Sequence, residues 1–93
     1  MEGLTASTLR DLEDVGSLYL RRQCSLGVVR VNFDRAATRL RLVAPEHADV
    51  VKSFAELLDR IDAKRPGKEQ YREVGAVLDR FGDWLMRSVG AAG

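Results

Sequence analysis

Apolar and polar residues alternate with a period of two along residues 28–44. One side of this segment carries most of its larger apolar side chains: Val29, Val31, Phe33, Leu40, Leu42 and Ala44. The opposite side carries arginines. Such alternation is typical of strands with one buried face, and a lone strand of β-branched residues would leave its backbone unpaired. The pattern therefore predicts an antiparallel β-hairpin with a polar outer face.

A helix is the alternative for the same segment. Asp34 could cap a short helix whose apolar residues recur with the helical period of about 3.6. Those residues are Ala36, Ala37, Leu40, Val43 and Ala44. With a helix here, the chain would be an all-α bundle.

The rest of the chain follows the helical period. A first helix is expected over residues 5–23, where Thr8 and Asp11 resemble a capping box. A second begins at Pro45 and ends at residues 65–67, because the residue before a proline is disfavoured in a helix. A third is expected over residues 68–89. We therefore expect an α+β fold, helix–β-hairpin–helix–helix, in one domain over residues 1–93 with frayed ends near 1–4 and 90–93.

The third predicted helix carries features that favour contact between copies of the chain. Gly75 and Gly82 lie seven residues apart on its apolar face, and each costs about 1 kcal/mol relative to alanine. Close approach of another backbone would explain them, and simple tolerance by a stable helix is the alternative. Trp84 and Val77 lie on the flank of the same face, where a tryptophan either covers the core or anchors an interface.

Arginine dominates the basic residues and is unevenly placed. Twelve of the 15 basic residues are arginines, and residues 21–43 carry six of them against Asp34 alone. Net charge is nevertheless only +1. An arginine guanidinium suits carboxylates and phosphates, although the amino-acid usage of a GC-rich genome would also explain the excess.

We expect these arginines to contact a partner. Arg30, Arg39 and Arg41 would project from the outer face of the hairpin and Arg35 from its tip. Val28 and Val43 lie among them and add an apolar patch, which favours an acidic protein surface. Nucleic acid is the alternative partner, since a two-stranded ribbon can enter the major groove.

No motif predicts catalysis, a cofactor or a metal. Cys24 and His47 lie on different predicted elements, so no catalytic pair is expected. Metal-binding loops and phosphate-binding glycine loops are missing from the sequence, and Asp59 and Asp62 look like solvated helix positions. We expect no enzyme activity and no small-molecule substrate.

The sequence predicts a cytoplasmic, non-catalytic interaction or regulatory module that self-associates as a homo-oligomer. The lone Cys24 fits a reducing compartment, and neither a signal peptide nor a membrane-spanning run is recognisable. Its partner would be another protein or its own copy, rather than a membrane.

Overall fold

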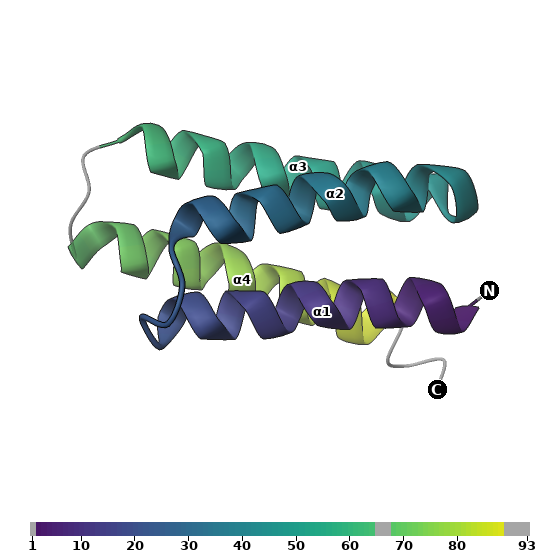
Figure 1. The fold of residues 1–93 in the computed structure, drawn as a ribbon, viewed down its shortest axis with the longest axis horizontal. Helices are drawn as coiled ribbons and strands as arrows, with labels where there is room; N and C mark the ends of the chain where they lie inside the picture. The colour runs from purple at the N-terminus through teal and green to yellow at the C-terminus, as the bar shows by residue number, and fades with distance from the viewer. Residues whose placement is uncertain (1, 65–67, 89–93) are drawn as a thin grey trace.

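The part of the chain that the structure describes, residues 2–64 and 68–88, forms four α-helices and no strand (Figure 1). The structure is a computed structural model. The helices are α1 (Glu2–Leu20), α2 (Leu26–Val43), α3 (Pro45–Ala63) and α4 (Lys68–Ser88). Successive helices run in opposite directions, which makes an up-down-up-down bundle with extents of 39 × 22 × 19 Å.

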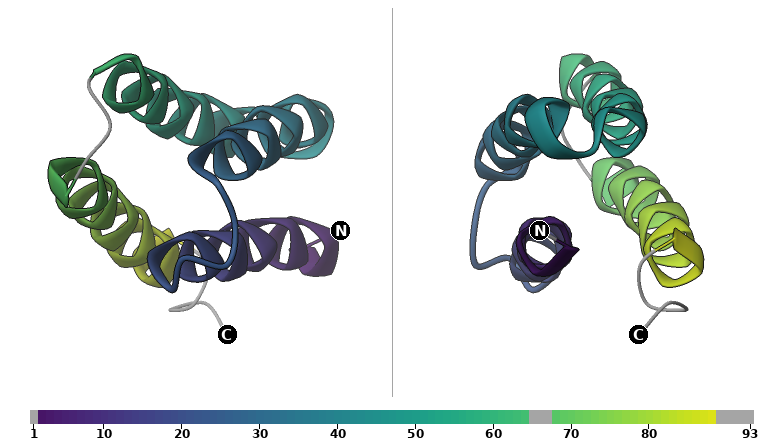
Figure 2. Two further views of the ribbon diagram at one scale, coloured as in Figure 1. Left: turned by 60° about the vertical axis from the view of Figure 1, so that its left-hand side comes forward. Right: turned by 90° about the vertical axis from the view of Figure 1, so that its right-hand side faces the viewer.

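The helices pack around a square when seen along the bundle (Figure 2). Each helix contacts the helices before and after it in the chain, and α1 also contacts α4. Pairs across the diagonal, α1 with α3 and α2 with α4, do not approach closely along the backbone. The α2–α3 pair is by far the most closely packed, and the α1–α4 pair is the least.

The predicted α+β fold is therefore wrong, and the all-α alternative is the observed one. The segment predicted as a hairpin is α2, whose buried residues recur with the helical period: Leu26, Val29, Phe33, Ala36, Ala37 and Leu40. Two residues that the hairpin would bury, Val31 and Leu42, are exposed, and Leu42 retains 89% of its accessible surface. The helix buries Ala36 and Ala37 in their place, together with Val29, Phe33 and Leu40, on one continuous face that packs into the core.

A sequence signal for the start of a helix lies just before the alternating segment. Ser25 is the N-cap, and its Oγ accepts a hydrogen bond from the backbone N–H of Val28 at 3.3 Å. A serine at this position satisfies a backbone donor that the first turn leaves without a partner. The valines of α2 each cost only a few tenths of a kcal/mol in helix propensity, so burial of one face outweighs them.

The first helix also differs from its predicted bounds. It begins at Glu2 rather than near Thr5, so Thr8 lies buried inside the helix and does not cap it. Its C-terminus is a Schellman motif, in which the N–H of Gln23 donates to the carbonyl of Leu18 and that of Arg22 to Tyr19. Arg22 has the left-handed φ of 64° that this motif requires.

The other two helices begin where the sequence predicts, at Pro45 and Lys68. The predicted stop at residues 65–67, the last predicted helical residue, 89, and the frayed C-terminal end at 90–93 lie outside the described residues. At the N-terminus, residues 2–4 are the first residues of α1.

Aromatic rings join three of the helices in the middle of the bundle. Phe81 of α4 meets Phe33 of α2 edge-on at 5.1 Å between ring centroids and Phe54 of α3 at 5.4 Å. Trp84 lies 5.8 Å from Phe81 and meets His47 edge-on at 5.4 Å. Edge-to-face geometry brings the positive ring edge to the negative ring face. Phe81 thus connects the tightly packed α2–α3 pair to α4.

Candidate functional site

The side of α2 that points away from the bundle is both apolar and basic. We call it the α2 outer face and define it by Val28, Val31, Arg35, Arg39, Leu42 and Val43. All six residues are exposed, and they recur at helical spacing, so one contiguous strip of the surface contains them. Exposed aliphatic side chains gathered on one helix, interleaved with arginines, are typical of a contact surface.

Arg30 lies apart from this face and is bound within the chain. Its Nε donates to an Asp59 carboxylate oxygen at 2.6 Å, and its guanidinium also donates to Asp62. Both carboxylates belong to α3, so Arg30 clamps α2 to α3. The hydrogen bonds to the two carboxylates raise the pKa of Arg30, with burial opposing them. Arg30, predicted to bind a partner, thus forms ion pairs within the chain. Asp59 and Asp62 are its ion-pair partners and not simply solvated helix positions.

The remaining predicted arginines are available for contact. Among the described side chains, no carboxylate lies within 4.0 Å of the guanidinium groups of Arg35, Arg39 or Arg41. Arg35 and Arg39 belong to the α2 outer face. Arg41 follows Arg30 by about three helical turns and therefore lies on the flank of α2 next to α3. The structure brings Arg35 and Arg39 together with the exposed valines, as a helix ridge instead of a hairpin face.

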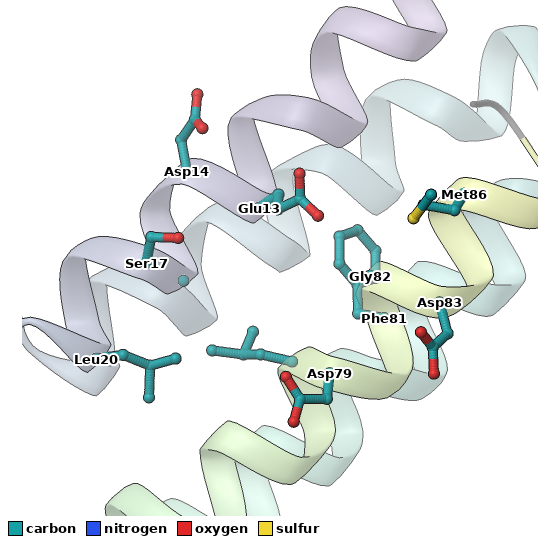
Figure 3. A pocket seen from close by; sticks show the side chains of 11 residues that line it. Glu13, Asp14, Ser17, Leu20, Asp79, Phe81, Gly82, Asp83 and Met86 are labelled. Atoms are coloured by element: carbon teal, nitrogen blue, oxygen red, sulfur yellow. The ribbon is translucent and has the colours of Figure 1, made fainter. Parts of the chain in front are cut away.

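A cleft opens on the other side of the bundle, between α1 and α4 (Figure 3). It has a volume of about 410 Å³. Its apolar lining includes Leu20, Leu78, Phe81 and Met86; its other lining residues are Glu13, Asp14, Gly16, Ser17, Asp79, Gly82 and Asp83. Figure 3 shows Glu13 extending from α1 towards Gly82 and Met86, whereas Asp14 points away from α4. We call this feature the α1–α4 cleft.

The α1–α4 cleft is acidic. Four carboxylates line it (Glu13, Asp14, Asp79 and Asp83) and no basic side chain does. No described lysine or arginine comes within 4.0 Å of any of the four. The cleft therefore combines an apolar floor, formed in part by the buried ring of Phe81, with an uncompensated negative rim.

Gly82 lines this cleft and Gly75 does not, and neither lies at a close helix crossing within the chain. A Cβ built on Gly82 would meet only the Glu13 carboxylate, at 3.5 Å, and one on Gly75 only Leu20, at 3.8 Å. Both are ordinary van der Waals distances. The tight position is Gly16 of α1, where a Cβ would lie 2.9 Å from a methyl carbon of Leu78. Within the chain, the glycine with the least space for a side chain therefore lies on α1, against a leucine side chain.

The two flanking residues of α4 differ in their surroundings. Val77 is buried in the core, while Trp84 is half-buried against Phe81 and His47. Trp84 therefore covers one end of the core. The contact between copies predicted for these residues and for the two α4 glycines stays a prediction.

We call the line of contact between α1 and α4 the α1–α4 seam. Stacked aromatic rings close one end of it. Tyr19 and Tyr71 stack at 4.8 Å between centroids, and the Arg22 guanidinium lies 4.9 Å from the centre of the Tyr71 ring. The Tyr19 hydroxyl donates to Gln70 Oε1 at 3.2 Å. Burial, and then the neighbouring Tyr71, Asp62 and Cys24, raise the pKa of Tyr19.

Cys24 and His47, which the sequence does not predict to form a catalytic pair, lie at opposite ends of α2. Cys24 precedes the helix and donates its S–H to the carbonyl of Val15, whereas His47 follows the helix and packs on Trp84. Burial raises the pKa of the Cys24 thiol, which makes it a weaker nucleophile. The described residues include no group of three or more His, Cys, Asp or Glu side chains placed to hold a metal ion. None of the described helices has the length and apolar character needed to span a bilayer.

No protein-family model, curated protein or solved structure matches this chain. The function must therefore be inferred from the two surfaces themselves. The sequence pointed to the arginines of the first surface but missed the cleft, because Glu13, Asp14, Asp79 and Asp83 each look like ordinary exposed helix positions. Only the pairing of α1 with α4 brings them together.

Proposed function

We propose that this protein is a non-catalytic interaction module whose α2 outer face binds an acidic protein surface. The observation that carries the proposal is the combination of Arg35 and Arg39, which have no described carboxylate partner, with exposed apolar side chains on the same strip. Its most exposed large apolar side chain is Leu42. The lone cysteine supports a reducing compartment, and we propose the cytoplasm.

The apolar content of the face favours a protein over a nucleic acid. Phosphate backbones are bound mainly by charge, whereas protein interfaces bury an apolar centre within a polar rim. Val31 and Leu42 are the most exposed apolar side chains of the face, and Arg35 and Arg39 lie between them along the helix. A carboxylate-rimmed apolar surface would satisfy both kinds of side chain at once.

The test uses two labelled probes and fluorescence anisotropy at low protein concentration. One probe is an amphipathic helical peptide of glutamate and leucine, and the other is a short DNA duplex. The face variant, Arg35→Gln/Arg39→Gln, is compared with Arg60→Gln/Arg72→Gln, which makes the same charge change at exposed positions on α3 and α4. We expect the face variant to weaken peptide binding roughly tenfold, since two exposed charge pairs contribute about 1.4 kcal/mol together.

The control variant should bind the peptide like the unchanged protein, and Leu42→Ser should also weaken binding. Equal losses in the face and control variants would show that only net charge matters, and would contradict the proposal. Tighter binding of the duplex, with affinity falling log-linearly and steeply with salt, would instead identify a nucleic-acid-binding protein.

A further inference from the structure

The α1–α4 cleft and the α2 outer face are complementary. The cleft has an apolar floor and four carboxylates with no base among its lining residues. The face has apolar side chains and two arginines with no described acid within 4.0 Å. Among the described large hydrophobic residues that are exposed, Val28, Val31, Leu42 and Val43 lie on the face, while Leu20 and Met86 line the cleft; Leu18 is the remaining one.

We propose that the α2 outer face of one copy docks in the α1–α4 cleft of a second copy. This inference rests on the proposed function and names the acidic surface that the face binds. Docking would bring Arg35 or Arg39 to the carboxylates of the rim and cover apolar side chains on both surfaces. Removing apolar surface from water supplies the affinity, and the opposite charges fix the orientation.

The arrangement of the helices prevents one copy from making this contact with itself. The α2 outer face points away from the bundle, and α2 lies diagonally opposite α4, which forms one wall of the cleft (Figure 2). The two surfaces therefore lie on different sides of the molecule. A contact between two different patches is heterologous, so a pair of copies still has a free cleft on one copy and a free face on the other, and assembly continues into rings or chains.

Two variants separate the halves of this contact. Arg35→Gln/Arg39→Gln impairs the face and leaves the cleft intact. Gly82→Lys impairs the cleft, because the new side chain starts 3.5 Å from the Glu13 carboxylate and adds a cation among the acids. The glycine is in a helix, and lysine has the higher helix propensity, so folding is preserved. Ala76→Lys, which adds the same charge to an exposed position of α4 outside the cleft, is the matched control.

Mass is measured by sedimentation velocity and light scattering over a concentration series reaching about 1 mM, the range of weak association. We expect the unchanged protein and the Ala76→Lys control to grow beyond a dimer as concentration rises. Each impaired variant alone should remain a monomer. An equimolar mixture should form a 1:1 complex and nothing larger, because it offers one good face and one good cleft.

Other outcomes overturn the inference. If the Gly82→Lys variant still assembles like the control, the cleft is not the docking site. If the mixture forms no complex, or the unchanged protein stays monomeric throughout the series, the face and the cleft do not bind each other. Loss of peptide binding in the face variant, measured separately with the acidic peptide, would still support the proposed function in those cases.

Discussion

The α2–α3 pair and the α1–α4 pair are both antiparallel helix pairs, yet they are packed in different ways. Between α2 and α3 the backbones lie close together along most of their length, with small buried residues on both helices: Ala36, Ala37, Ala48 and Ala55. Between α1 and α4 the backbones approach closely only over a short stretch, Leu78 fills the space beside Gly16, and a cleft remains. The α2–α3 pair therefore forms the closely packed scaffold of the bundle, and the α1–α4 pair leaves a recess.

Substituting a leucine into each helix pair tests this contrast and should give the largest change in stability. Ala55→Leu overpacks the buried α3 surface and should lower the free energy of unfolding by about 1–3 kcal/mol. Gly82→Leu places the same side chain in the cleft, where the built Cβ meets nothing closer than 3.5 Å, and should leave stability unchanged or raised. Urea denaturation measures both. An equal loss in both variants would show that the α1–α4 seam is as closely packed as the scaffold.

Removing ion pairs is a second test of the α2–α3 contact, with a smaller expected change in stability. Arg30→Gln removes the contacts to Asp59 and Asp62 that join α2 to α3, and should cost about 1 kcal/mol, since charged hydrogen bonds in a network exceed an isolated surface pair. Lys64→Gln removes the more exposed pair with Glu73 and should cost at most a few tenths of a kcal/mol. Thermal denaturation of both variants checks the order. If Arg30→Gln leaves stability unchanged, apolar packing alone joins α2 to α3.

The closed end of the α1–α4 seam gives a third test at Arg22. Arg22→Gly relieves the left-handed backbone but loses the contact with the Tyr71 ring, and these effects of about 0.5–1 kcal/mol each should nearly cancel. Arg22→Ala loses the contact without relief, so it should be less stable than Arg22→Gly by about 1 kcal/mol. Equal stabilities of the glycine and alanine variants would show that the turn is unstrained.

The smallest effect concerns Cys24 beside the same end of the seam. Because burial raises its pKa, less thiolate forms at pH 8 than for an exposed cysteine, and iodoacetamide should react more slowly with the folded protein than with the protein in urea. The folded thiol keeps its proton to a higher pH than the unfolded thiol does. Its contribution to stability is therefore complete below the unfolded pKa and is lost as pH rises through the folded pKa. Equal alkylation rates in the two states would contradict a partly buried thiol with a raised pKa.

The secondary structure could be predicted from the sequence wherever the apolar residues follow a single period. The third predicted helix follows the helical period alone, and the apolar residues Val74, Phe81 and Leu85, which recur with that period, are buried in α4. In α2 two periods overlap, because Val29, Phe33 and Leu40 satisfy both the strand pattern and the helix pattern. Four other residues separate the two patterns: Ala36 and Ala37 are buried, whereas Val31 and Leu42 are exposed.

The candidate site was less predictable than the fold. The arginines of α2 stand out as a charge excess within one short segment, so local composition reveals them. It does not reveal which one is bound within the chain, because Asp59 and Asp62 are about 30 residues from Arg30 and meet it only when α2 folds against α3. The cleft depends in the same way on the meeting of the first and last helices.

The connection between α2 and α3 has a consequence for the order of folding. Ala44 alone joins the two helices: its N–H donates to Leu40, and its carbonyl accepts from His47 and Ala48. So short a connection costs little loop-closure entropy, and contacts near in sequence form fastest. The helical hairpin of α2 and α3 is expected to form in the folding transition state, with α1 and α4 docking on it afterwards. Mutations in the hairpin should then slow folding, whereas mutations along the α1–α4 seam should mainly speed unfolding.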